Sequence, residues 1–103
     1  MEKQQTTTLS RGDVVYSLCG RDGGRIYAVT QVEGEYAYIA DGKVRKAGAP
    51  KRKKIKHLIP LGAAIRGYCK REEEFGISDP YLRLSLRPYR NYKLEEGLCQ
   101  RTT

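Results

Sequence analysis

The sequence predicts an all-β protein built around a small five-stranded barrel. Between residues 10 and 60, short runs of β-branched and aromatic residues follow one another closely, and glycine-bearing turns separate them. Tight antiparallel turns of this kind favour a closed or nearly closed barrel, in which few strand edges stay exposed. We expect a polar, flexible tail over residues 1–9 and a partly ordered extension over residues 61–103.

The predicted strands follow from local composition. Five runs have the character of strands: residues 14–18, 25–32, 36–40, 43–46 and 55–59. The dipeptide Asp41-Gly42 predicts a two-residue hairpin turn between the third and the fourth. Pro60 is expected to end the barrel. We expect six apolar side chains from these strands in the core: Val15, Ile26, Val29, Val32, Ile39 and Val44.

Two features are less regular. Ile26 and Val29 lie three positions apart, which does not fit strict alternation, and a bulge after Gly24 would reconcile them. In the extension, residues 63–74 have the composition of a short helix. Asp79 and the proline that follows it predict the start of another helix, with Asp79 as its N-cap.

Composition argues against several classes of function. No run of eighteen apolar residues exists and no signal-peptide pattern opens the chain, so we expect a cytoplasmic protein with no membrane partner. Cys19, Cys69 and Cys99 are widely spaced, and His57 is the only histidine. We therefore expect no disulfide framework, no metal and no cofactor. Without recognisable nucleophilic machinery, we predict no enzymatic activity and no small-molecule substrate.

The charge is concentrated in one segment. Lys and Arg number 20 against 12 Asp and Glu, which gives a net charge of +8. Residues 1–42 carry four bases and six acids, residues 43–60 eight bases and no acid, and residues 61–103 eight bases and six acids. A solvated charged face is the plain alternative, but so many like charges repel one another. Binding to RNA would offset that repulsion, because cationic side chains that contact phosphates release the counterions of the RNA.

We expect RNA contacts from eleven side chains: Arg21, Arg25, Lys43, Arg45, Lys46, Lys51, Arg52, Lys53, Lys54, Lys56 and His57. Packing and base stacking both stay open for the histidine. The loop glycines Gly20, Gly23 and Gly24 let the chain turn, and they also permit close approach of a phosphate to the backbone. One of the tyrosines is expected to contact RNA. Half of those in the strands (Tyr27, Tyr36 and Tyr38) should point outward.

Three motifs in order carry a family resemblance. They are Gly-Arg-Asp-Gly-Gly-Arg at residues 20–25, Ala-Asp-Gly at 40–42 and Lys-Lys-Ile-Lys-His-Leu at 53–58. Together with the segment that begins at Gly12 and leads into the first predicted strand, they resemble bacterial KOW-domain RNA-binding proteins related to the ribosomal large-subunit protein L-fourteen-e. The similarity covers residues 9–60, so the tail and the extension gain nothing from it.

The resemblance implies an SH3-like (KOW) barrel that binds ribosomal RNA or sits among large-subunit proteins, without catalysis. A second interpretation is a protein–protein interaction module of the transcription or translation machinery, because SH3-like barrels host many functions. Four residues of the extension would then dock on a partner: Tyr81, Leu82, Leu84 and Leu86. The basic segment favours RNA, since a protein-only module has no need of it.

Overall fold

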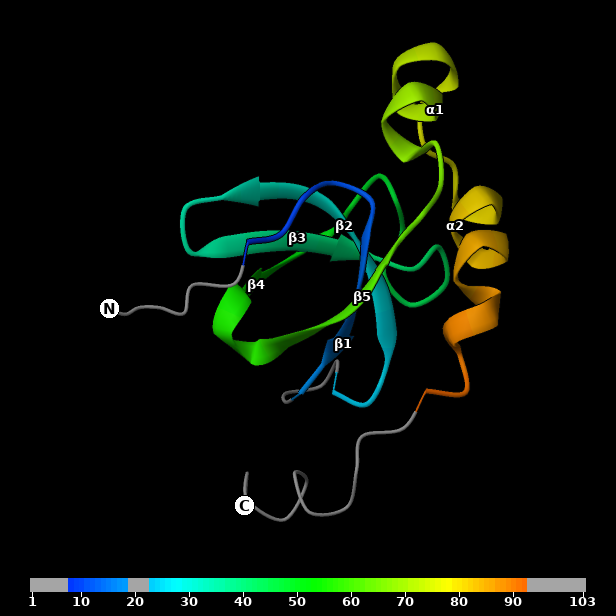
Figure 1. Ribbon diagram of the computed structural model, residues 1–103. Coiled ribbons are helices and arrows are strands. Elements are labelled where there is room, and N and C mark those ends of the chain that lie inside the picture. The colour runs from blue at the N-terminus through cyan, green and yellow to red at the C-terminus, as the bar shows by residue number, and fades with distance from the viewer. Residues whose placement is uncertain (1–7, 19–22, 93–103) are drawn as a thin grey trace.

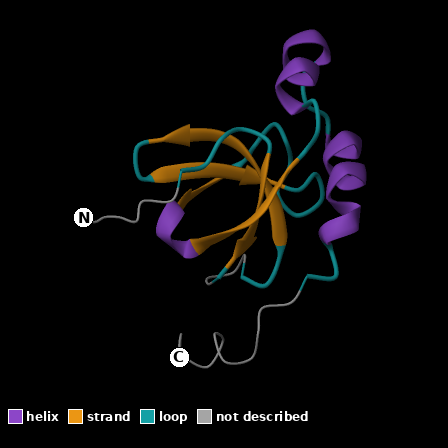
Figure 2. Ribbon diagram, in the orientation of Figure 1, coloured by secondary structure: helices purple, strands orange, loops and turns teal. Residues whose placement is uncertain are grey.

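The β-branched and aromatic runs pair into one five-stranded antiparallel sheet, and two short α-helices follow it (Figures 1 and 2). This computed structural model describes residues 8–18 and 23–92. The strands are β1 (Asp13–Ser17), β2 (Ile26–Glu33), β3 (Tyr36–Ala40), β4 (Lys51–Lys54) and β5 (Leu58–Ala64). The helices are α1 (Tyr68–Phe75) and α2 (Asp79–Leu86), with 3-10 turns η1 (Ile55–His57) and η2 (Arg87–Tyr89). The strand-rich fold expected from the sequence is confirmed.

The strand order is β4-β3-β2-β1-β5, so the first and last strands lie side by side. Ser17 pairs with Leu58, and Val15 pairs with Pro60. The expectation that Pro60 ends the last strand is wrong, because β5 continues to Ala64. Proline is tolerated there because β5 is an edge strand, where a missing N–H leaves no neighbouring strand unsatisfied.

The expected fourth strand over residues 43–46 is also wrong. Those residues form a bent loop, and Val44 is 47% exposed instead of buried. The strand that pairs with β3 is the lysine-rich β4, with Tyr36 opposite Lys54 and Ile39 opposite Lys51. Charged residues suit this place because β4 is an edge strand, where they discourage pairing with a second chain.

Both faces of the sheet are apolar. One face, which we call the inner face, buries seven residues together: Leu9, Val15, Tyr27, Val29, Ala37, Ile39 and Leu58. The opposite, outer face buries Val14, Ile26, Ala28 and Ala40. Of the six predicted core residues, Val15, Ile26, Val29 and Ile39 are buried and Val32 packs against the inner cluster; only Val44 lies at the surface.

The irregularity in β2 is real but lies elsewhere than expected. Ile26 belongs to the outer cluster and Val29 to the inner one, so no bulge after Gly24 is needed. The register between β2 and β3 shifts instead between Val29 and Gln31. This extra residue turns Val29 and Val32 toward the same face, although they are three positions apart.

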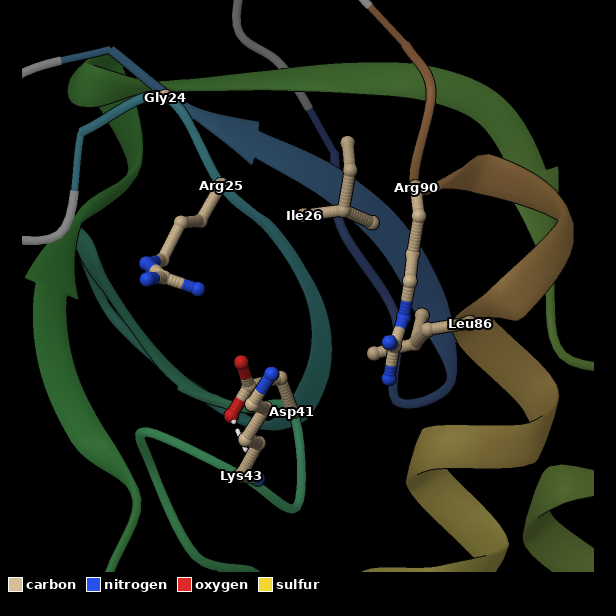
Figure 3. Close-up of a pocket in the computed structure, with 7 residues that line it drawn as sticks. All are labelled: Gly24, Arg25, Ile26, Asp41, Lys43, Leu86 and Arg90. Atoms are coloured by element: carbon tan, nitrogen blue, oxygen red, sulfur yellow. Dashed lines mark hydrogen bonds between the residues drawn. The ribbon is translucent and has the colours of Figure 1, made fainter.

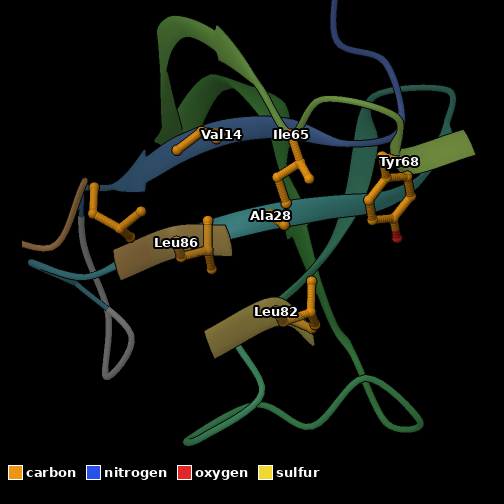
Figure 4. Packing of buried hydrophobic residues seen from close by; sticks show 8 residues of the cluster. Val14, Ala28, Ile65, Tyr68, Leu82 and Leu86 are labelled. Atoms are coloured by element: carbon orange, nitrogen blue, oxygen red, sulfur yellow. The ribbon is translucent and has the colours of Figure 1, made fainter. Parts of the chain in front are cut away.

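The chain after β5 completes the outer cluster. Ile65, Tyr68, Leu82 and Leu86 pack with the outer-face residues of the sheet, as Figure 4 shows. Leu82 and Leu86 are four residues apart on α2 and therefore share one face of the helix. The N-cap of α2 is Ser78 and not Asp79: the Ser78 hydroxyl accepts a hydrogen bond from the Tyr81 backbone N–H at 3.3 Å.

Tyr68 joins the first helix to this cluster. Its side chain is 3% exposed and rests on Gly12, where any Cβ would collide with it. Burial, reinforced by the nearby Glu72 carboxylate, raises the pKa of the Tyr68 phenol to about 12. Beyond Tyr68, α1 projects away from the sheet (Figure 1) and presents an exposed Phe75.

Replacing Leu82 with Ala should lower the free energy of unfolding by about 2–5 kcal/mol, because it removes a fully buried side chain and leaves a cavity. Leu84→Ala is the matched control: it lies on the same helix but is 61% exposed, so we expect a change within about 0.5 kcal/mol. Urea denaturation followed by circular dichroism measures both. Equal losses would mean that α2 does not pack through Leu82.

Candidate nucleic-acid interface

The basic segment, residues 43–57, is divided among three structural elements. Its cations are Lys43, Arg45 and Lys46 in the loop 41–50, Lys51, Arg52, Lys53 and Lys54 in β4, and Lys56 in η1. Half of these side chains are exposed and half are partly buried, so none is lost in the core. All eight cationic side chains therefore reach the surface. Within β4 they divide between the two faces of the sheet, because Lys51 and Lys53 pair with the inner-face residues Ile39 and Ala37.

Strand β4 holds two of its cations against an aromatic ring. Lys54 pairs with Tyr36 and Arg52 with Tyr38, and directly opposed residues share a face of the sheet. The Arg52 guanidinium lies 4.3 Å from the centre of the Tyr36 ring, and the Lys54 ammonium lies 5.9 Å from it. Cations at these distances are attracted by the negative face of the ring. Tyr36 therefore orders two charges on the outer face.

The three tyrosines considered for base stacking (Tyr27, Tyr36 and Tyr38) divide between the two faces. Tyr27 is fully buried in the inner cluster, where no base can reach it. Tyr36 and Tyr38 are half-buried on the outer face, beyond the part that α2 covers. The Tyr38 hydroxyl donates to a Glu33 carboxylate oxygen at 3.1 Å, which fixes the ring. Two of the three candidates for stacking on a base thus remain.

The loop 41–50 is wide, and the predicted two-residue hairpin at Asp41-Gly42 is wrong. The Asp41 Oδ1 atom accepts hydrogen bonds from the backbone N–H groups of Lys43 and Arg45, both at 2.9 Å. The N–H groups of Asp41 and Gly42 donate in turn to the Arg45 carbonyl, at 2.9 and 3.0 Å. This side-chain turn replaces the tight hairpin and points the basic residues outward.

Helix α2 fixes the loop from the other side. The Ala47 backbone N–H donates to Asp79 Oδ1 at 2.7 Å, and Arg83 Nη1 donates to the Gly42 carbonyl at 2.7 Å. These contacts join residues 32 and 41 positions apart. No local pattern in the sequence marks Asp79 or Arg83 as partners of the loop 41–50, so neither residue was predicted to contact it.

The glycine loop is described from Gly23 onward, and Gly20 and Arg21 lie outside the described residues. Gly24 has φ of +79°, a conformation that side chains disfavour, and this confirms its role in the turn. Its N–H donates to the Ser17 carbonyl at 2.8 Å, while the Ser17 N–H donates to the Arg25 carbonyl at 3.0 Å. Arg25 is exposed and lines a small pocket together with Asp41 and Lys43 of the loop 41–50.

His57 ends the basic segment in η1, with a partly buried side chain. Its carbonyl accepts from the Leu18 N–H at 3.0 Å, so its backbone has a structural role between β1 and β5. Base stacking by the ring stays a prediction.

The four residues expected to dock on a protein partner do not form one surface. Leu82 and Leu86 are 0% and 2% exposed inside the chain's own core, whereas Leu84 is exposed and Tyr81 is half-buried. Within residues 8–18 and 23–92, no group of three His, Cys, Asp or Glu side chains is arranged to hold a metal ion. In the same part of the chain, no helix is long and apolar enough to cross a membrane.

No protein-family model matches the chain, and no curated protein is significantly similar to it.

The contact between loop and helix can be tested at Gly42. A Cβ there would collide with the Asp79 backbone, and φ is +79°; at Gly34, φ is also positive (+61°) but nothing lies within 4 Å. We expect Gly34→Ala to lower the free energy of unfolding by about 1–2 kcal/mol through backbone strain. Gly42→Ala should lose about 1–3 kcal/mol more, because it also overpacks the contact. Thermal and urea melts measure both, and equal losses would contradict the contact.

Proposed function

We propose that this protein is a non-catalytic RNA-binding protein with an SH3-like barrel of the KOW type. One observation carries the proposal: an acid-free basic segment is held in order at the sheet edge, with Arg52 and Lys54 over the Tyr36 ring. Ordering like charges in this way costs free energy through repulsion. Binding of RNA, a polyanion, offsets that cost, because contacts between cationic side chains and phosphates release counterions.

The barrel form is supported by the inner cluster. Apart from Leu9, its members come from β1, β2, β3 and the first residue of β5, so four strands share one set of packed side chains. The last strand pairs with the first, and a 3-10 turn joins β4 to β5. A five-stranded sheet of this connectivity with a shared core is consistent with a small barrel.

The chemistry of the surface favours structured RNA read mainly through its backbone. Lysines and arginines along β4 and the loop 41–50 are suited to phosphates, which position a protein without specifying sequence. Tyr36 and Tyr38 lie beside Arg52 and Lys54 on the outer face and offer ring faces to unstacked bases in loops or bulges. Most of the affinity should therefore come from phosphates, and the tyrosines should add shape recognition.

The partner we propose is ribosomal RNA, on the large subunit in the cytoplasm. This step rests on the resemblance of residues 9–60 to the L-fourteen-e-related KOW proteins, and the exposed basic segment is consistent with it.

The salt dependence of RNA binding tests the proposal. With large-subunit ribosomal RNA as probe, log affinity should fall with log salt concentration at a slope of about −3 to −5. Replacing Arg52 and Lys54 with Gln should make that slope shallower by about 1–2, because two phosphate contacts are lost. The matched control replaces Arg66 and Lys70, which are exposed and lie outside the basic segment.

The control should leave the slope unchanged. Binding that is insensitive to salt, or equal effects of the two double variants, would contradict an interface on β4.

A further inference from the structure

A small pocket lies between the glycine loop at Gly24, the loop 41–50 and the end of η2 (Figure 3). Its volume is about 160 Å³. Arg25 and Arg90 approach it from opposite sides in Figure 3, and Asp41 and Lys43 lie between them. Three segments far apart in the sequence thus each contribute a cationic side chain to this pocket. Arg90 lies outside both the glycine loop and the basic segment.

The three cationic side chains of the pocket are not neutralised by ion pairs with other described residues. Within residues 8–18 and 23–92, none of Arg25, Lys43 and Arg90 forms an ion pair. Asp41 contributes one negative charge, but its Oδ1 atom already accepts two backbone N–H groups of the loop. Three positive charges around one carboxylate leave an excess of two, which attracts an anion.

The size and the walls of the pocket limit the kind of ligand that it can bind. About 160 Å³ corresponds to roughly five water molecules and is well below the roughly 300 Å³ at which small-molecule sites begin. One wall is apolar and rigid, because Ile26 and Leu86 are 8% and 2% exposed in the outer cluster. Gly24, at the rim, leaves the approach free of a side chain. Such a site takes one charged group of a larger ligand.

We propose that this pocket binds a single phosphate group, held by Arg25, Lys43 and Arg90. Arginine forks match phosphate oxygens bidentately, and Lys43 adds a point charge. Lys43 also belongs to the loop that leads directly into β4, so the pocket and the β4 surface are joined by one basic stretch of chain. That the phosphate belongs to RNA rests on the proposed function; that the pocket binds phosphate does not.

Titration of the full chain with inorganic phosphate, followed by amide NMR shifts at constant ionic strength, tests the pocket alone. We expect saturable shifts at Gly24 and Lys43, and about a tenfold or greater loss of affinity in Arg25→Gln/Arg90→Gln. The control Arg66→Gln/Arg87→Gln removes two exposed arginines outside the pocket, one of them from η2, and should bind as the parent does. Absence of saturable shifts, or equal affinity in both double variants, would overturn the proposal.

Measuring RNA binding by the same variants then tests the pocket and the proposed function independently. Oligouridine with a 5′-phosphate or a 5′-hydroxyl is compared: a preference for the first identifies a terminal phosphate, and equal binding identifies an internal one. In either case the Arg25/Arg90 variant should bind more weakly than the control. If it binds RNA as the control does while Arg52→Gln/Lys54→Gln binds weakly, the pocket contributes nothing to RNA binding and the proposed function stands. If phosphate binds but neither oligouridine nor large-subunit ribosomal RNA does, the proposed function fails and the anion pocket remains.

Discussion

The contact on which the rest of the structure depends is the packing of α2 on the outer face of the sheet. Leu82 and Leu86 are almost completely buried there, each contributing about 1.5–3 kcal/mol of apolar burial. Without the helix, Val14, Ile26 and Ala28 would face water. The same helix supplies Asp79 and Arg83, which hydrogen-bond the backbone of the loop 41–50. Packing of the outer cluster and placement of the loop 41–50 therefore both depend on this one contact.

This packing divides the outer face into two parts with different chemistry. Under α2 the face is apolar and closed. Past the bulge between Val29 and Gln31 it becomes polar and open, and there Tyr36 carries the cations of β4. The bulge lets β2 keep its inner side apolar while its outer side changes from Ala28 to Gln31. A surface of ordered cations and a helix-covered core can thus share a sheet of five short strands.

Local composition was sufficient for three of the strands and for the basic segment, because β-branched runs and uninterrupted charge are local properties. It failed between residues 41 and 54, where the Asp41 side chain and α2 together override the hairpin preference of Asp-Gly. It also missed α2 as part of the core, because the four-residue spacing of Leu82 and Leu86 is too short a pattern to distinguish a helix. That Arg25 and Arg90 line the same pocket depends on the tertiary fold alone.

Native-state hydrogen exchange tests most directly whether α2 and the basic loop form one unit. The Ala47 amide is protected by the Asp79 side chain, and the Leu82 amide by the Ser78 carbonyl within the helix. If the loop depends on the helix, both amides exchange through the same opening, with equal protection and the same dependence on denaturant. Fast exchange at Ala47 beside a protected Leu82 would contradict this account, because the loop would then open while α2 stays in place.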